Sequence, residues 1–120
     1  MDSQSGPLSA LGFARNATQP EPARTEIDCL AGPTLLEFGT SWCGYCRAAL
    51  PLIAAAFAAH PEVRHVKVED GSGRKLGRSF DVTLWPTLVF LNDGREVARV
   101  VRPRDAASVE AGFARFDAAS

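Results

Sequence analysis

Apolar and polar positions recur along this chain with the spacings of short strands. Residues 34–38 form a short apolar run, which is typical of a strand buried on both faces. Residues 63–69 alternate valines with polar side chains and predict a second strand. Residues 88–91 and 96–101 predict two more, and the Asn-Asp-Gly-Arg sequence at 92–95 between them predicts a hairpin turn.

Helical segments are predicted between these strands. A helix over residues 20–30 starts with prolines, which a first turn accepts, and ends at a Gly-Pro pair. An Ala-rich helix over residues 43–59 contains Pro51, which must kink it. A short helix is predicted over residues 74–80. A last helix follows residue 103, with apolar side chains at i, i+4 and i+7 on one face.

The first ten residues are polar and rich in serine, glycine and proline, a composition typical of a disordered tail. Residues 11–18 predict a short edge strand. The order of elements from there is β-α-β-α-β-α-β-β-α. We therefore expect one α/β domain over residues 11–120, with a central mixed sheet of about five strands and helices on both of its faces.

Composition narrows the classes of function. The net charge of −1 gives no electrostatic basis for binding nucleic acid or an anionic membrane. No apolar run approaches the ~18 residues of a membrane span. The N-terminus lacks the apolar block of a secretory signal, so the protein is cytoplasmic or its leader has been removed. Three cysteines are too few for a disulfide scaffold and fit a reducing compartment with one working pair.

Two of these cysteines carry the candidate chemistry. Cys43 and Cys46 lie between the strand at 34–38 and the Ala-rich helix that follows. A Cys-x-x-Cys in that position is typical of a redox pair. The free N–H groups and dipole of a helix start lower the pKa of Cys43, and the thiolate is the form that attacks disulfides. We expect Cys43 to be exposed, and Cys46, one turn later, to be buried.

A metal site is the main alternative. Cys43, Cys46, His60 and His65 satisfy a zinc-finger spacing. In a finger, however, the cysteines lie on a hairpin and the histidines on the helix, whereas here the helix begins at the cysteines. We favour the redox interpretation and keep as the alternative a non-catalytic binding module, or a metal-binding domain that uses these four residues.

Several features in the right order resemble the thioredoxin family, from residue 34 to the C-terminus. They are Glu37 six residues before Cys43, the Trp42-Cys43-Gly44-Tyr45-Cys46 motif, Pro51 five residues after Cys46, Lys67, the Trp85-Pro86-Thr87 sequence and the Asp93-Gly94 hairpin.

The resemblance implies a thioredoxin-like fold and a thiol–disulfide oxidoreductase. Cys43 would attack a disulfide of a protein substrate, and Cys46, helped by Glu37, would resolve the mixed disulfide. Lys67 would face Glu37. No bound cofactor is implied, because a partner reductase would supply electrons, and we expect a monomer. The expected substrate contacts are Trp42, Gly44, Tyr45, Trp85 and Pro86.

The sequence departs from the family pattern at four places. Tyr45 replaces a proline, the buried acid Glu37 replaces an aspartate, and Trp85 is bulky. The glycine expected after the last strand is missing around Arg102. These departures bear on the partner enzymes and the redox poise. A cis bond at Pro86 would leave the Trp85 backbone free to pair with an extended substrate segment.

Three side chains have two interpretations each. Glu37 is either a solvated residue of an edge strand or a buried acid that moves protons for Cys46 through water. Lys67 is either solvated or paired with Glu37. Cys29 is expected to be a small buried hydrophobe at a helix end, and a second redox role would require it to lie near Cys43.

Overall fold

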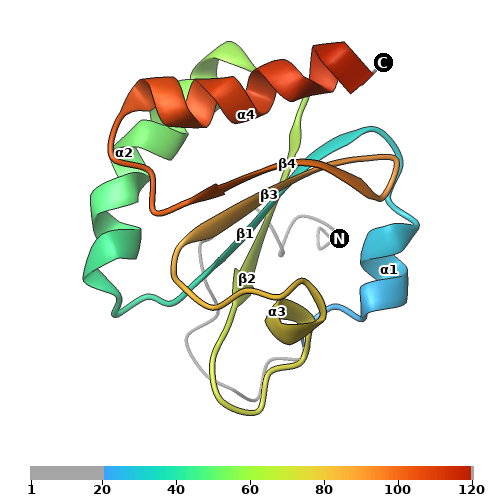
Figure 1. Cartoon of the computed structure of the whole chain (residues 1–120), viewed down its shortest axis with the longest axis vertical. Helices are drawn as coiled ribbons and strands as arrows, with labels where there is room; N and C mark the ends of the chain where they lie inside the picture. Colours follow the sequence, from blue (N-terminus) through green and yellow to red (C-terminus); the bar gives the residue numbers. More distant parts are fainter. Residues whose placement is uncertain (1–20, 120) are drawn as a thin grey trace, which may run out of the picture.

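A computed structural model describes residues 21–119 of the chain. The predicted tail at residues 1–10 and the predicted edge strand at 11–18 lie outside the described residues. Within the described part, four strands form one mixed sheet in the order β2-β1-β3-β4 (Figure 1). Their bounds are β1 Pro33–Gly39, β2 Arg64–Glu69, β3 Thr87–Asn92 and β4 Arg95–Val101. The fold class is the expected one, with four described strands where about five were predicted.

Strand directions follow from the connections. β1 and β2 are parallel, because a helix carries the chain back between them. β3 runs antiparallel to β1, and β4 antiparallel to β3. The last pair is joined by a two-residue turn in which Asp93 and Gly94 both have positive φ, 52° and 81°. That is the turn geometry that Asp-Gly favours, so the predicted hairpin is confirmed.

Four helices surround the sheet. Their bounds are α1 Arg24–Asp28, α2 Gly44–Ala59, α3 Leu76–Ser79 and α4 Ala106–Ala119. α1 and α3 are shorter than predicted. α1 begins only after Pro22, with Ala23 as its N-cap, and the Ala23 N–H donates to the Glu26 carboxylate at 2.7 Å. α3 begins where Glu21 accepts hydrogen bonds from the N–H groups of Lys75 and Leu76.

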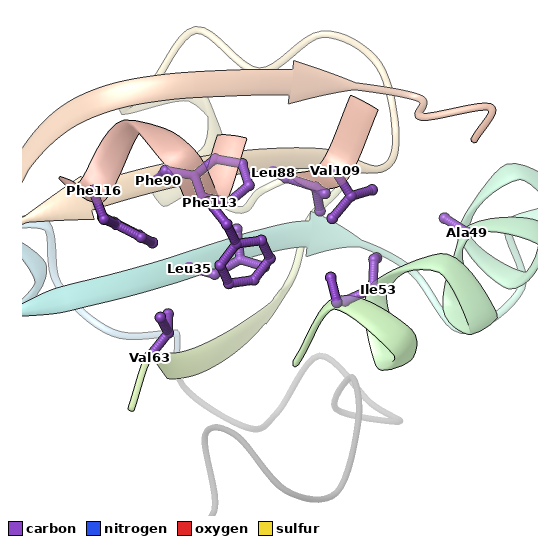
Figure 2. Close-up of a cluster of buried hydrophobic side chains, with 10 residues drawn as sticks. Leu35, Ala49, Ile53, Val63, Leu88, Phe90, Val109, Phe113 and Phe116 are labelled. Carbon is purple, nitrogen blue, oxygen red and sulfur yellow. The ribbon is translucent and has the colours of Figure 1, made fainter. Parts of the chain in front are cut away.

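One face of the sheet packs on α2 and α4, which lie together on the same side in Figure 1. α2 turns Cys46, Ala49, Ile53 and Ala56 inward, at the spacing of one helical face. Phe113 of α4 is 2% exposed and packs in the same apolar cluster, between α4 and the strands (Figure 2). The opposite face packs on α1 and α3 through a second apolar cluster. Both faces of β1 and β3 are therefore buried, which the apolar run at 34–38 predicted for β1. No helix in residues 21–119 is long and apolar enough to cross a membrane.

Register brings three distant segments to one end of the sheet. Phe38, near the end of β1, lies opposite Thr87 at the start of β3, and Thr87 lies opposite Val101 at the end of β4. The loop after β1, the loop before β3 and Arg102 after β4 must therefore meet there. α2 begins at the same end, because it follows the loop after β1.

Candidate active site

Cys43 occupies the N-cap of α2. Its backbone is extended (φ −80°, ψ 124°), and its sulfur accepts a hydrogen bond from the Cys46 N–H with an N–S distance of 3.3 Å. This is the capping role that a serine or aspartate oxygen usually plays, here filled by sulfur. Both thiols are free. The sequence therefore places a dithiol across the first turn of a helix, as the motif predicted.

The two thiols differ in acidity. Burial raises the pKa of Cys43, but hydrogen bonds from the Cys46 side chain and from the N–H groups of Cys46 and Tyr45, with the positive charge of Arg102, outweigh it. The pKa of Cys43 is consequently lowered. Burial, together with the hydrogen bond to Cys43 and the charges of Cys43 and Glu37, raises the pKa of Cys46 to about 12. One sulfur is therefore favoured as thiolate and the other as thiol.

The exposure of Cys43 differs from the prediction. Cys43 is 7% exposed and Cys46 is 2% exposed, so both are buried. The N-cap geometry gives the reason: the Cys43 sulfur bends back over the first turn to accept the Cys46 N–H, which turns it away from solvent. The asymmetry of the pair lies in its hydrogen bonds and charges more than in its exposure.

Glu37 is completely buried in β1, so the interpretation as a solvated edge residue is wrong. Its Oε1 lies 2.6 Å from His65 Nε2, and His65 stacks on Phe57 of α2 with ring centroids 4.4 Å apart. Its Oε2 is buried without a hydrogen-bond partner among the described residues. Lys67 lies opposite Glu37 in the β1–β2 register. Its pairing with the Glu37 carboxylate stays a prediction.

Aromatic side chains cover the outer surface of the site. Trp42 is 67% exposed and meets Trp85 edge to face, with ring centroids 5.6 Å apart. Tyr45 is also exposed. A side chain at Gly44 would meet no atom within 4 Å, so the protein's own packing does not require glycine there. These residues are free to touch a bound segment, and that role stays a prediction.

The loop before β3 carries Trp85 and Pro86, joined by a cis peptide bond. The Trp85 indole N–H donates to Asp70 Oδ2 at 2.8 Å. The Trp85 backbone was expected to be free for a substrate, but its carbonyl accepts from Arg102 Nε at 2.8 Å, and Arg102 N–H donates to Pro86 O at 2.9 Å. The expectation was therefore wrong for the Trp85 carbonyl. Arg102 stands where the family pattern has a glycine, and a glycine has no side chain that could bond to this carbonyl.

The four residues of the zinc alternative do not come together. α2 separates Cys46 from His60, a rise of about 20 Å at 1.5 Å per residue. His60 bonds to Glu110, and His65 bonds to Glu37. Within residues 21–119, no group of three or more His, Cys, Asp and Glu side chains could hold a metal ion.

Cys29 is exposed at the end of α1, contrary to the expectation that it is buried.

Sequence reasoning gave no role in the redox site to four residues that contact its parts, although His65 was considered as a metal ligand. His65 bonds to Glu37, Asp70 bonds to Trp85, the Thr40 backbone bonds to Cys46, and Arg102 bonds to the loop before β3. His65 could have been found, since it lies two positions before Lys67 and so on the same face of β2. For Arg102, the only indication in the sequence was that the glycine of the family pattern is missing there.

Replacing Tyr45 with proline should raise the pKa of Cys43. The variant loses the Tyr45 N–H, one of the groups that lower this pKa, and proline is tolerated in a first helical turn. We expect alkylation of Cys43 at about pH 7 to slow by about 3- to 10-fold, since a hydrogen bond to a charged group is worth ~1 kcal/mol or more. The pH profile of labelling measures this. Tyr45→Phe keeps the N–H and should label like the parent; if both variants label alike, the backbone donor is unimportant.

Comparison with known proteins gives one consistent result. The Thioredoxin family model matches residues 18–115. A thioredoxin from Chlamydia pneumoniae is 36% identical over 75 residues, which cover 62% of this chain and 74% of that protein. The solved structure of thioredoxin 2 from Pseudomonas aeruginosa PAO1 in its reduced form is 59% identical, with a TM-score of 0.76 over 91% of this chain and 97% of that chain. The structure of Fasciola hepatica thioredoxin is 28% identical, with a TM-score of 0.63 over 77% of this chain and 86% of that chain.

Proposed function

The chain belongs to the thioredoxin family, whose members are protein-disulfide oxidoreductases, and from that premise we propose how its residues divide the work of disulfide exchange. The observation that carries the proposal is the hydrogen-bonded dithiol at the start of α2, with the pKa of Cys43 lowered and that of Cys46 raised. Cys43 is the attacking thiolate. Cys46 keeps its proton until the second step.

The exchange has two steps. The Cys43 thiolate attacks one sulfur of a substrate disulfide, forms a mixed disulfide and releases the other substrate sulfur as a thiolate. Cys46 then loses its proton and attacks the Cys43 sulfur, which releases the second substrate sulfur and leaves a Cys43–Cys46 disulfide. Two electrons pass to the substrate, and a reductase partner returns two electrons to the pair. No bound cofactor is needed within the domain.

Glu37 is the proposed acceptor of the Cys46 proton. It is buried, and its charge contributes to raising the pKa of Cys46, so it lies close enough to act on that thiol. Its Oε1 is held by His65, while its Oε2 has no described partner. An unpartnered carboxylate oxygen is the atom that can accept a proton, through an intervening water, when Cys46 attacks.

Replacing Glu37 with glutamine should slow the second step and spare the first. Glutamine keeps the volume and an oxygen for His65 but cannot take a proton, so resolution of the mixed disulfide should slow by about 100-fold near neutral pH. Rapid mixing with a disulfide substrate separates the two steps. The urea midpoint should hold or rise slightly, because a neutral amide costs less to bury than a carboxylate.

Glu110→Gln is the matched control for this variant. Glu110 also pairs with a histidine, His60, with 2.5 Å between Oε2 and Nε2, but at the far end of α2. Its substitution should leave both kinetic steps unchanged. If Glu37→Gln resolves the mixed disulfide as fast as the parent, the proton role of Glu37 is wrong.

The physiological partners can be identified with a Cys46→Ser variant. Cys43 still attacks, but the mixed disulfide is not resolved, so substrates stay attached through a bond that dithiothreitol releases. We expect disulfide-containing proteins in the trapped fraction, and a Cys43→Ser, Cys46→Ser double variant to trap none. Equal trapping by the two variants would contradict the assignment of Cys43.

We also propose that the protein is a monomer and works in the reducing cytoplasm. Sedimentation of the reduced protein tests whether it is a monomer.

A further inference from the structure

Arg102 is a charged side chain in contact with the aromatic surface of the site, and the two steps above give it no part. It follows β4 directly, with a positive φ of 50° that non-glycine residues rarely adopt. Three contacts hold it: its N–H on Pro86 O, its Nε on Trp85 O, and its guanidinium 3.9 Å above the centre of the Tyr45 ring.

These contacts use only part of the guanidinium. Arg102 Nη1 and Nη2 donate to no acceptor among residues 21–119. The side chain is half-buried, and Tyr45 beneath it is 59% exposed. Two N–H-bearing nitrogens in a fixed fork are consequently left without a partner among the described residues, beside the loop that carries Trp85 and Pro86. A fork of this kind matches the two oxygens of a carboxylate.

The charge balance around the fork favours an anion. Arg102 is close enough to Cys43 that its positive charge helps to lower the pKa of that thiol. The Asp70 carboxylate, which contacts the same loop, is already engaged by the Trp85 indole N–H. Arg102 touches both Tyr45, two residues after Cys43, and Trp85, so a substrate residue beside the cysteine that Cys43 attacks comes within its reach.

We propose that Arg102 is a specificity-determining residue that selects disulfides flanked by an acidic side chain, through a paired contact between its free Nη groups and a substrate carboxylate. The inference rests on the disulfide exchange described above. It places the substrate preference on a residue outside the Cys-x-x-Cys motif. A glycine at this position could offer neither the fork nor the charge.

The test uses three peptide disulfides that differ only in the residue beside one cysteine, which is glutamate, glutamine or lysine. The fully reduced protein attacks each under single-turnover conditions, and the second-order rate constant is measured. For the parent we expect the glutamate peptide to react about 3- to 10-fold faster than the glutamine peptide, and the lysine peptide to react more slowly than both. High salt should reduce the preference, because the contact lies near the surface.

Arg102→Gln should remove the preference. Loss of its charge also weakens activation of Cys43, so all three peptides should slow by a common factor, and the ratio of their rates isolates the contact. Arg102→Lys keeps the charge and should retain part of the preference. Arg102→Gly relieves the positive φ and should fold at least as well as the parent while losing the preference, which guards against a result due to misfolding.

Arg104→Gln is the matched control, because it removes the same charge two positions along from an exposed arginine. It should keep the parent's preference. The proposal is overturned if Arg102→Gln keeps the full glutamate preference, if Arg104→Gln abolishes it equally, or if the parent shows none. A parent that fails to attack even the glutamine peptide would instead contradict the exchange function itself, so the two failures are distinct.

Discussion

Cys43→Ser is expected to abolish reduction of insulin disulfides with dithiothreitol as the electron source. Serine fits the N-cap and preserves the helix, so the variant should fold. Its hydroxyl is not a nucleophile toward disulfides, and burial, the largest cause of the raised pKa of Cys46, persists in the variant, so Cys46 stays protonated and cannot take over. We expect the rate to fall at least about 10³-fold, to the dithiothreitol background.

Cys29→Ser is the matched control, because Cys29 is a free, exposed thiol outside the site. Its activity should equal that of the parent. Thermal melts of both variants distinguish loss of chemistry from loss of fold. Full activity in the Cys43→Ser protein would mean that the attacking sulfur has been assigned wrongly.

Alkylation of the reduced protein should be strongly unequal between the two thiols of the pair. A pKa of about 12 leaves Cys46 with a thiolate fraction of about 10⁻⁵ at pH 7. The pKa of Cys43 lies below the ordinary 9.0, so its thiolate fraction at pH 7 exceeds about 10⁻². The rates should therefore differ by at least about 10³-fold. The rate at Cys43 should rise with pH and level off below the ordinary thiol value. Iodoacetamide labelling read by mass spectrometry follows each cysteine separately.

Cys29 provides an internal reference in the same sample, because it is exposed. Labelling of Cys43 is limited by its low exposure as well as by its protonation, so the comparison with Cys46, which is also buried, isolates acidity. Equal rates at Cys43 and Cys46 would contradict the hydrogen-bond asymmetry described for the pair.

Local patterns accounted for most of the fold. The apolar run of β1, the Asp93-Gly94 turn and the apolar face of α4 each carry their signal within a few residues, and each was predicted correctly. The ends of α1 and α3 were not predicted correctly. They depend on which N–H groups Glu26 and Glu21 satisfy, and Glu21 acts on residues more than fifty positions away.

The same distinction between local and long-range contacts holds for the site. The Cys43–Cys46 pair and the hydrogen bonds that help to order its acidity lie within one helical turn, so the sequence was sufficient to predict them. The partner of Glu37 and the contacts of Arg102 depend on strand register and on a side chain crossing between loops. The exposure of Cys43 was predicted wrongly because a helix start was equated with an open surface, whereas the sulfur caps its own helix.

The meeting of three segments at one end of the sheet also sets the order in which reactivity appears during synthesis. The dithiol and its first turn are complete by residue 47, but the Trp85 loop follows about forty residues later and Arg102 later still. A nascent chain that stops before β4 lacks the arginine that helps to acidify Cys43. One of the groups that lower the pKa of this thiol is therefore added only when the last strand has been made, long after the two cysteines themselves.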